Sequence, residues 1–399
     1  MSGDTRKPAR FLPYGKQSIS EDDIAAVVRV LRSDWLTQGP AIPEFEEAMC
    51  KRVGAQYAVA VSNATAALHI ACIALGLGPG QLLWTSPNTF VASANCARYC
   101  GAEVDFVDID PDTLNMSMPA LNAKLEMAQR QGRLPDVVVP VHFGGLPCDM
   151  HEIARLAARY GFSVLEDASH AVGAEYRDER TGSCSYSDVA VFSFHPVKVM
   201  TTGEGGMLLT NDRQLWEKLC LLRSHGTTRN SDQMASESHG SWYYEQVLLG
   251  YNYRMTDIQA ALGISQLSRL DEFLARRRLL ARRYDKLLSG LAVRTQMEVA
   301  TAQSANHLYP ARIVSPNVDR RQVFDQLRSA GIGVNVHYIP VHTQPYYSAL
   351  GFKRGDFPEA EKYYAQAISL PLHFELTDSD QDYIVAELER ALAEHPGVA

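Results

Sequence analysis

Short runs of consecutive apolar residues alternate with helical stretches from residue 57 to residue 210, and this alternation restricts the fold more than any other feature. The apolar runs, each of which predicts a buried strand, are 57–61, 82–85, 104–107, 137–141, 163–165, 189–194 and 207–210. Helices are expected between them, over 64–76, from 87–90 onward, over 118–129 and 150–160, and after them over 214–222. Strands without polar alternation are typical of a mostly parallel sheet covered by helices on both faces, so the chain is predicted to be an α/β protein.

The remainder of the chain suggests additional units around this sheet. A helical pattern covers 22–31, and another runs without interruption from 258 to 288, where we expect the joint between two domains. Beyond it, strands at 307–314 and 334–338, a helix at 320–329 and a last helix capped by Thr377 predict a small α/β domain. We therefore expect an N-terminal arm (1–21), a large domain (22–265) and a small C-terminal domain (266–399).

Lys198 occupies an unusual place in this pattern. It follows the apolar run 189–194 after a short turn, and a glycine-rich segment, 203–206, leads into the next apolar run. Lysine is rarely buried without a partner, and burial lowers the pKa of its amine and makes it nucleophilic. The alternative is an ordinary lysine on a surface turn.

Polar residues stand at the ends of several predicted strands, where ligands collect in parallel sheets. Asp167 and Ser193 follow two of them, and Thr65 lies in a turn of small and hydroxylated residues that opens the helix after 57–61. Free N–H groups at a helix N-terminus favour a phosphate. The same residues are also the usual choice for a plain helix cap.

Several classes of protein are disfavoured. The net charge of −8 argues against a nucleic-acid partner, and no apolar run is long enough to span a membrane. Residues 1–7 lack the apolar core of a signal peptide, so we expect a cytoplasmic protein. Neither GxGxxG after the first strand nor a P-loop motif occurs. The seven cysteines have no zinc-binding spacing, which predicts free thiols and no metal.

A nucleophilic lysine, a phosphate cradle and a strand-end aspartate are together what a pyridoxal 5'-phosphate enzyme requires. The lysine forms a Schiff base with the cofactor, and the aspartate pairs with the pyridine nitrogen. Phe90 is a candidate for stacking on the pyridine ring.

The sequence also resembles the DegT/StrS-type family of sugar-nucleotide aminotransferases, which are fold type I enzymes. The motifs that carry the resemblance lie in order along most of the chain, at 36–40, 63–68, 166–170, 192–198, 203–206, 223–226 and 250–255.

The resemblance implies a role for each matching residue. Lys198 would be the Schiff-base lysine and proton shuttle, and Asp167 would bind the pyridine nitrogen. His170, which is glutamine in many relatives, would approach the ring hydroxyl. Phe90 would stack on the ring. Relatives that carry histidine in place of the lysine are dehydratases, so Lys198 favours transamination.

The same resemblance assigns the phosphate contacts and the assembly. Thr65, the backbone of Ala66 and Ser193 would hold the phosphate. Asn252 would reach the phosphate of the neighbouring subunit, which makes a homodimer the expected functional unit.

Within the family, 194–206 and 86–95 are most similar to the enzymes of pseudaminic acid synthesis. These aminate C4 of a UDP-linked 2-acetamido-2,6-dideoxy-4-ketohexose with glutamate as amino donor. Candidate substrate contacts, for which ordinary packing is an equal possibility, are Trp35, Thr37, Gln38, His337 and Tyr338. The sequence is also compatible with an aminotransferase for another nucleotide-linked 3- or 4-keto sugar, with a different fold type I enzyme such as an acyltransferase or decarboxylase, and with a non-catalytic sugar-binding module.

Overall fold

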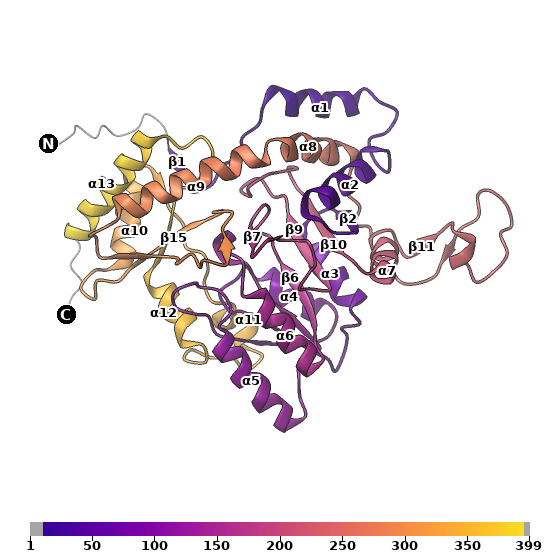
Figure 1. The fold of residues 1–399 in the computed structure, drawn as a ribbon, viewed down its shortest axis with the longest axis horizontal. Helices are drawn as coiled ribbons and strands as arrows, with labels where there is room; N and C mark the ends of the chain where they lie inside the picture. The colour runs from indigo at the N-terminus through magenta and orange to yellow at the C-terminus, as the bar shows by residue number, and fades with distance from the viewer. Residues whose placement is uncertain (1–10, 395–399) are drawn as a thin grey trace.

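A computed structural model describes residues 11–394 of the chain, so the first ten residues of the predicted N-terminal arm and the last five of the small domain lie outside it. At its centre is a seven-stranded sheet with the order β2-β10-β9-β6-β5-β3-β4 (Figure 1). Its strands are β2 (Tyr57–Val61), β3 (Leu82–Thr85), β4 (Glu103–Phe106), β5 (Val137–Val139), β6 (Ser163–Asp167), β9 (Val189–Ser193) and β10 (Gly206–Thr210). All neighbours run parallel except β10, which is antiparallel to both β2 and β9.

Helices cover both faces of this sheet, because successive strand residues point to opposite sides. One face packs on α3 (Ala64–Ala74), α4 (Ala92–Tyr99) and α7 (Arg213–Arg223). The other face packs on α2 (Ala41–Val53), α5 (Met118–Gln131), α6 (Met150–Tyr160) and α8 (Asp257–Ser268). In β2, Val59 and Val61 face the first layer, and Ala58 and Ala60 face the second.

A second, smaller unit is built on the sheet β13-β15-β17, formed by Val293–Thr295, Tyr309–Ile313 and Ala367–Leu370. It packs with α9 (Leu270–Leu287), α10 (Arg320–Ser329) and α13 (Asp378–Glu394) in a separate apolar core. The N-terminal strand β1 (Leu12–Pro13) pairs with β16 (Ile332–Gly333) of this unit, and Leu12 is fully buried in its core. The predicted domain boundary at 265–266 falls inside α8.

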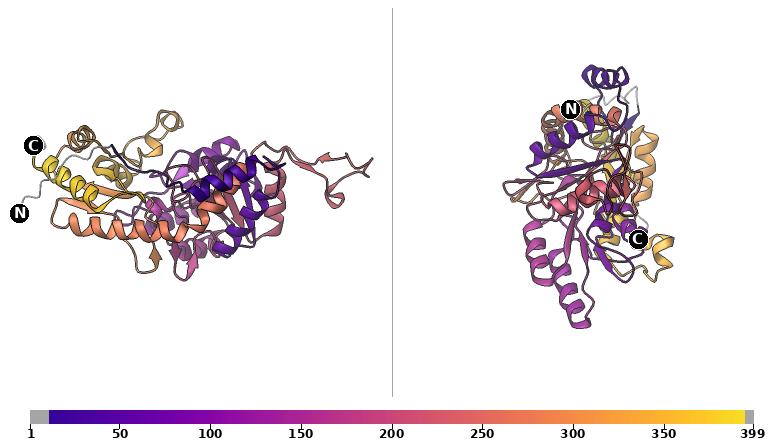
Figure 2. Two further views of the ribbon diagram at one scale, coloured as in Figure 1. Left: turned by 90° about the horizontal axis from the view of Figure 1, so that it is seen from above. Right: turned by 90° about the vertical axis from the view of Figure 1, so that its right-hand side faces the viewer.

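A hairpin projects from the body beyond α7 (Figures 1 and 2). Its short strands are β11 (Thr227–Thr228) and β12 (Glu245–Gln246). Trp242 and Leu249 are 72% and 77% exposed on this segment. The remaining described elements are α1 (Glu21–Leu31), β7 (Glu175–Tyr176), β8 (Glu179–Arg180), β14 (Ala302–Gln303), α11 (Pro345–Ser348) and α12 (Pro358–Gln366), with 3-10 turns at Phe143–Gly145, Ser231–Gln233 and Val341–Thr343.

Two predicted elements are wrong, and a third begins later than predicted. The predicted continuous helix 258–288 is two helices that meet at Arg269, whose guanidinium pairs with Asp23 of α1 at 3.5 Å and lies over the Phe273 ring. Residues 334–338 are not a strand, and the helix predicted from 87–90 onward begins only at Ala92, as α4, because 87–90 and 334–341 bond to each other.

The contacts between 87–90 and 334–341 explain both departures. The Tyr338 N–H donates to Asn88 Oδ1 at 3.3 Å, and the Val341 N–H donates to the Pro87 carbonyl at 2.9 Å. These contacts join the small unit to the end of β3. No helix within 11–394 is both long enough and apolar enough to cross a membrane.

Candidate active site

Lys198 lies in the tight loop that connects β9 to β10. Its backbone N–H donates to the His195 carbonyl at 2.9 Å, and the Phe194 carbonyl accepts from both Thr201 Oγ1 and the Thr202 N–H. Burial lowers the pKa of the Lys198 amine to about 8, although the nearby Asp167 carboxylate acts in the opposite direction. About a tenth of this amine is therefore uncharged at pH 7.

Asp167 is the last residue of β6 and is 5% exposed. Its Oδ2 accepts a 2.6 Å hydrogen bond from Ser93 Oγ, and its Oδ1 accepts from the Ser169 N–H at 3.1 Å. The Ser93 hydroxyl also bonds Thr89 Oγ1 at 2.8 Å. The sequence did not single out Ser93 or Thr89. The available signal was a pair of hydroxyl residues four apart, just past a strand end.

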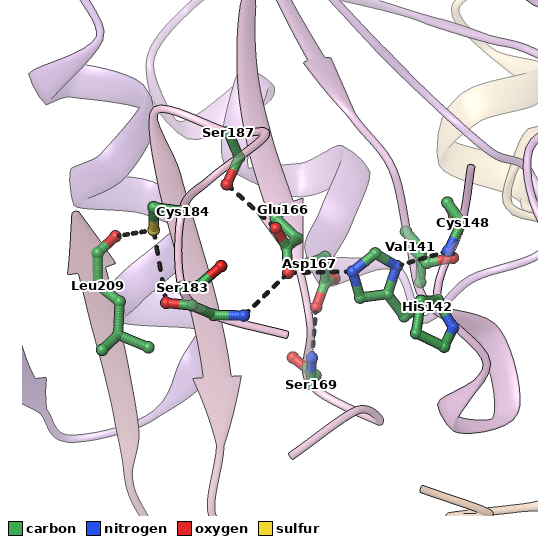
Figure 3. Close-up of polar contacts among 12 residues, drawn as sticks. Val141, His142, Cys148, Glu166, Asp167, Ser169, Ser183, Cys184, Ser187 and Leu209 are labelled. Atoms are coloured by element: carbon green, nitrogen blue, oxygen red, sulfur yellow. Dashed lines mark hydrogen bonds and ion pairs between the residues drawn. The ribbon is translucent and has the colours of Figure 1, made fainter. Parts of the chain in front are cut away.

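A second buried polar group lies behind Asp167 (Figure 3). Glu166 Oε1 is 3.1 Å from His142 Nε2, and Glu166 Oε2 accepts from Ser187 Oγ at 3.0 Å. The backbone N–H of His142 donates to the backbone carbonyl of Asp167 at 3.2 Å. Main-chain and side-chain bonds together hold Asp167 in one orientation.

The ends of three adjacent strands meet the N-terminus of α3. Gly206 pairs with Val61 on one side and with Ser193 on the other. A Cβ on Gly206 would lie 2.6 Å from the Asn63 carbonyl carbon, so only glycine permits this close approach. Asn63 caps α3 by accepting from the Ala66 N–H at 2.8 Å.

This junction also places Thr65 and Ser193 near one another. Thr65 lies in the first turn of α3, and Ser193, which is 6% exposed, ends the strand next to Gly206. Hydroxyl groups and a helix N-terminus are donors that suit an anion such as a phosphate. The Ala66 N–H already has an acceptor in Asn63.

His170 and Tyr338 form a wall beside Lys198. His170 Nε2 lies 3.1 Å from the Tyr338 hydroxyl, and the two residues come from different units of the chain. Burial, followed by the charge of Lys198, lowers the pKa of His170 well below its usual value. His170 is therefore a neutral imidazole at physiological pH. The exposed Phe90 ring lies 6.2 Å from the Tyr338 ring.

His337 and His307 complete this wall. His337 Nδ1 lies 2.8 Å from Ser369 Oγ, and burial together with Lys198 lowers its pKa to about 3. The His307 ring is buried with its centroid 4.5 Å from that of His170. His307 was predicted only as part of a strand, and nothing in the local pattern distinguished it from a core residue.

The loop that carries Trp35, Thr37 and Gln38 is fixed to the start of α8. Thr37 forms a β-bridge with Thr256, and the two oxygens of Asp257 accept the N–H groups of residues 39 and 41 at 2.8 and 3.0 Å. Trp35 lines a separate groove of about 570 Å³ between α1, α2 and α8. Trp35 therefore lies on this groove, whereas Thr37 lies against the start of α8.

Asn252 lies at the base of the projecting hairpin. It forms a β-bridge with Ser224 and is exposed. This position leaves its side chain available to another subunit.

An amine of lowered pKa, a fixed carboxylate and a set of anion donors meet at the carboxyl ends of β2, β6 and β9. This donor set fits pyridoxal phosphate, whose aldehyde, pyridine nitrogen and phosphate have complementary chemistry.

The chain matches known proteins over nearly its whole length. Residues 17–389 match the model of the DegT/DnrJ/EryC1/StrS aminotransferase family. The spore coat polysaccharide biosynthesis protein SpsC of Bacillus subtilis is 40% identical, over 95% of this chain and 97% of that protein. The UDP-4-amino-4,6-dideoxy-N-acetyl-beta-L-altrosamine transaminase of Campylobacter jejuni is 36% identical, over 94% and 96%.

Among solved structures, the putative sugar aminotransferase Spr1654 of Streptococcus pneumoniae in its PMP form superposes with a TM-score of 0.87 at 30% identity. The match covers 96% of this chain and 99% of that one. The same protein has also been solved in a PLP form. This similarity confirms the predicted fold class, a fold type I α/β structure with a smaller C-terminal unit.

Proposed function

Because the chain belongs to the DegT/DnrJ/EryC1/StrS aminotransferase family, and is therefore a sugar aminotransferase that uses pyridoxal phosphate, we propose that it aminates C4 of a UDP-linked 2-acetamido-2,6-dideoxy-4-ketohexose with glutamate as donor. The observation that carries this proposal is the full-length similarity to the Campylobacter jejuni transaminase, whose name specifies a 4-amino-4,6-dideoxy sugar linked to UDP. Under this proposal the enzyme acts in pseudaminic acid synthesis.

Lys198 has the central role in the proposed reaction. Bound pyridoxal phosphate supplies an electron sink that stabilises negative charge next to the amino nitrogen. The lowered pKa of Lys198 gives a free amine, whose Nζ accepts a proton from the cofactor carbon and delivers it to C4 of the sugar. Asp167, aligned by Ser93, accepts a hydrogen bond from the pyridine nitrogen and keeps it protonated.

The remaining proposed cofactor contacts come from the junction at the start of α3 and from His170. Thr65, Ala66 and Ser193 hold the phosphate, with Ala66 contributing through its backbone at the start of α3. His170 lies beside the ring hydroxyl. Its low pKa makes it a neutral hydrogen-bonding partner there.

Phe90 makes the proposed ring contact, and Tyr338 and His337 make the proposed substrate contacts. Phe90 stacks on the pyridine ring under this proposal, and the exposure of its ring beside Tyr338 supports that role. Tyr338 and His337 present polar groups to the sugar from the small unit.

A homodimer completes the site under this proposal. Asn252, at the base of the hairpin, reaches the phosphate of the neighbouring subunit. The exposed loop with Trp35, Thr37 and Gln38 contributes substrate contacts at the same interface.

SpsC supports a second candidate, an aminotransferase for another nucleotide-linked 3- or 4-keto sugar of surface polysaccharides, because its identity is slightly higher. A panel of UDP- and dTDP-linked 3-keto and 4-keto sugars, each with glutamate, distinguishes the two, with the product identified by NMR. Amination at C4 of the UDP-linked 2-acetamido sugar in preference to all others is expected. Preferred turnover of a sugar without the 2-acetamido group would overturn the proposal in favour of the second candidate.

A further inference from the structure

Three of the seven cysteines lie together where α3 packs on α4. Cys72 is on α3, Cys96 is on α4, and Cys100 is the C-cap of α4. Cys72 and Cys96 are fully buried, whereas Cys100 is partly exposed and packs against the same apolar cluster. The transamination described above uses none of these thiols.

The contact between the two helices places Cys100 next to Cys72. The Cys100 thiol approaches the His69 carbonyl, with Sγ 3.9 Å from the oxygen. His69 and Cys72 are three residues apart on α3 and so share one face of that helix. The side chains of Cys72 and Cys100 therefore come together where the two helices pack.

The imidazole of His69 is fixed beside this pair. Its Nδ1 lies 3.2 Å from the Tyr253 hydroxyl, and its ring centroid is 4.8 Å from that of Tyr251. The other ring nitrogen, Nε2, is buried and has no hydrogen-bond partner. The Cys72 thiol, with a further contribution from His69, lowers the pKa of Cys100 to about 6 against the opposing effect of burial. A lowered pKa favours the thiolate, which is the form that reacts with oxidants.

We propose that Cys100 is a peroxide-reactive thiol and that its oxidation links it to Cys72 in a disulfide across α3 and α4. The Cys100 thiolate attacks one oxygen of hydrogen peroxide, the O–O bond breaks, and hydroxide leaves, which gives a sulfenic acid. The sulfur of Cys72 then attacks the Cys100 sulfur, an S–S bond forms, and the hydroxyl group leaves as water with the Cys72 proton. Two thiols are oxidised, and one peroxide is reduced to two waters.

Cys96 is the other cysteine near Cys100, but its position is less suitable for a disulfide with Cys100. Cys96 and Cys100 are four residues apart at the end of one helix, where Cβ atoms are about 5–6 Å apart. A disulfide requires Cβ atoms at about 3.5–4.5 Å. The Cys96 thiol is also engaged with the Ser93 carbonyl, with Sγ 3.2 Å from the oxygen.

The disulfide would join the two helices that position the cofactor. The first turn of α3 carries Thr65, and the first turn of α4 carries Ser93, which holds Asp167. A covalent link between α3 and α4 shifts these first turns relative to each other, so cofactor retention should depend on the redox state. This second effect rests on the proposed contacts of Thr65 and Asp167.

The experiment treats the holoenzyme with hydrogen peroxide, removes the excess with catalase, alkylates free thiols and maps disulfides by mass spectrometry without reduction. A linked peptide pair containing Cys72 and Cys100 is expected in the wild type and in C96A and C220A, and it should be absent in C72A and C100A. The visible absorbance of bound cofactor shows that each variant is folded. No Cys72–Cys100 pair in the wild type, or a pair of Cys72 with Cys96 in its place, would overturn the proposal.

Cofactor retention is measured on the same samples, without any sugar substrate. After dialysis, the oxidised wild type should retain several-fold less cofactor than the reduced protein and recover on reduction followed by added cofactor, whereas oxidised C100A should match reduced C100A. A linked pair with unchanged retention would overturn the coupling to the cofactor. Because neither readout involves a sugar, failure here is distinct from failure of the proposed substrate.

Discussion

Ser93 donates a 2.6 Å hydrogen bond to the Oδ2 atom of Asp167, from the first turn of α4 to the last residue of β6. A short bond to a buried carboxylate fixes its direction more strongly than a bond between neutral groups would. The side chain proposed to face the pyridine nitrogen is thus oriented by a residue that itself makes no proposed contact with the cofactor.

Replacing Ser93 with alanine should therefore weaken cofactor binding. A hydrogen bond to a charged group contributes about 1.5–3 kcal/mol, which corresponds to an increase in cofactor Kd of about 10-fold to 150-fold. The measurement is absorbance titration of the apo-protein with pyridoxal phosphate. Ser187→Ala is the matched control, because Ser187 donates to the adjacent Glu166 at 3.0 Å. An equal loss in both variants would show that the effect is structural.

The lowered pKa of Lys198 predicts the pH dependence of cofactor attachment. Only the uncharged amine attacks an aldehyde, and with a pKa of about 8 roughly a tenth of it is uncharged at pH 7 and about nine tenths at pH 9. The rate at which the apo-protein captures pyridoxal phosphate should rise about tenfold between pH 7 and pH 9 and then level off. Stopped-flow absorbance measures this rate.

The Asp167→Asn variant tests the pKa of Lys198 by lowering it further. The Asp167 carboxylate raises the pKa of Lys198, so its removal should move the inflection of the rate profile to lower pH. A rate that continues to rise through pH 10 in the wild type would contradict a lowered pKa for Lys198.

Gly206→Ala should disturb the phosphate cradle. The added Cβ would lie 2.6 and 2.7 Å from backbone atoms of Asn63 and Ala64, which cannot move without shifting the start of α3. Overpacking of this kind costs about 1–3 kcal/mol, and part of this cost should appear as weaker cofactor binding. Gly78→Ala is the control, since its Cβ would meet only the end of Gln81, at 3.7 Å. Unchanged cofactor affinity in Gly206→Ala would contradict the placement of the cradle.

A shared active site predicts complementation between two inactive variants. Lys198→Ala should lower kcat by at least about 10³-fold, since both the proton shuttle and the covalent attachment are lost. Asn252→Ala should weaken cofactor binding. In a hybrid dimer, the subunit that keeps Lys198 faces the partner that keeps Asn252, so one complete site is restored.

The measurement is the activity of the two variants after they are mixed, denatured and refolded together at limiting cofactor. Activity well above the sum of the two refolded separately is expected. If mixing adds nothing although hybrid dimers are detected by native mass spectrometry, Asn252 acts within its own subunit.

The large sheet could be predicted from the sequence because its strands are buried on both faces. Continuous apolar runs predicted β2 and β3 with the observed bounds, Tyr57–Val61 and Leu82–Thr85. Lys198 and Asp167 followed from their places at the ends of such runs. These predictions need only local pattern and the rule for ligands at strand ends.

What could not be predicted depends on contacts between distant segments. Ser93 and His307 have ordinary local surroundings and become site residues only through Asp167 and His170, which lie far from them in the chain. The break at Arg269 likewise follows from a contact with α1 rather than from a glycine or proline.

Val61, Gly206 and Ser193 lie side by side in the sheet. This register also determines how long β2 lacks its partner strand while the chain is being synthesised. The sole sheet partner of β2 among the described residues is β10, and Gly206 follows Val61 by about 145 residues. At about 5–20 residues per second, the ribosome needs on the order of 10 s or more to deliver that partner. Throughout this interval the apolar strand of a nascent chain has an open edge, so synthesis is the period when this protein most needs protection from aggregation.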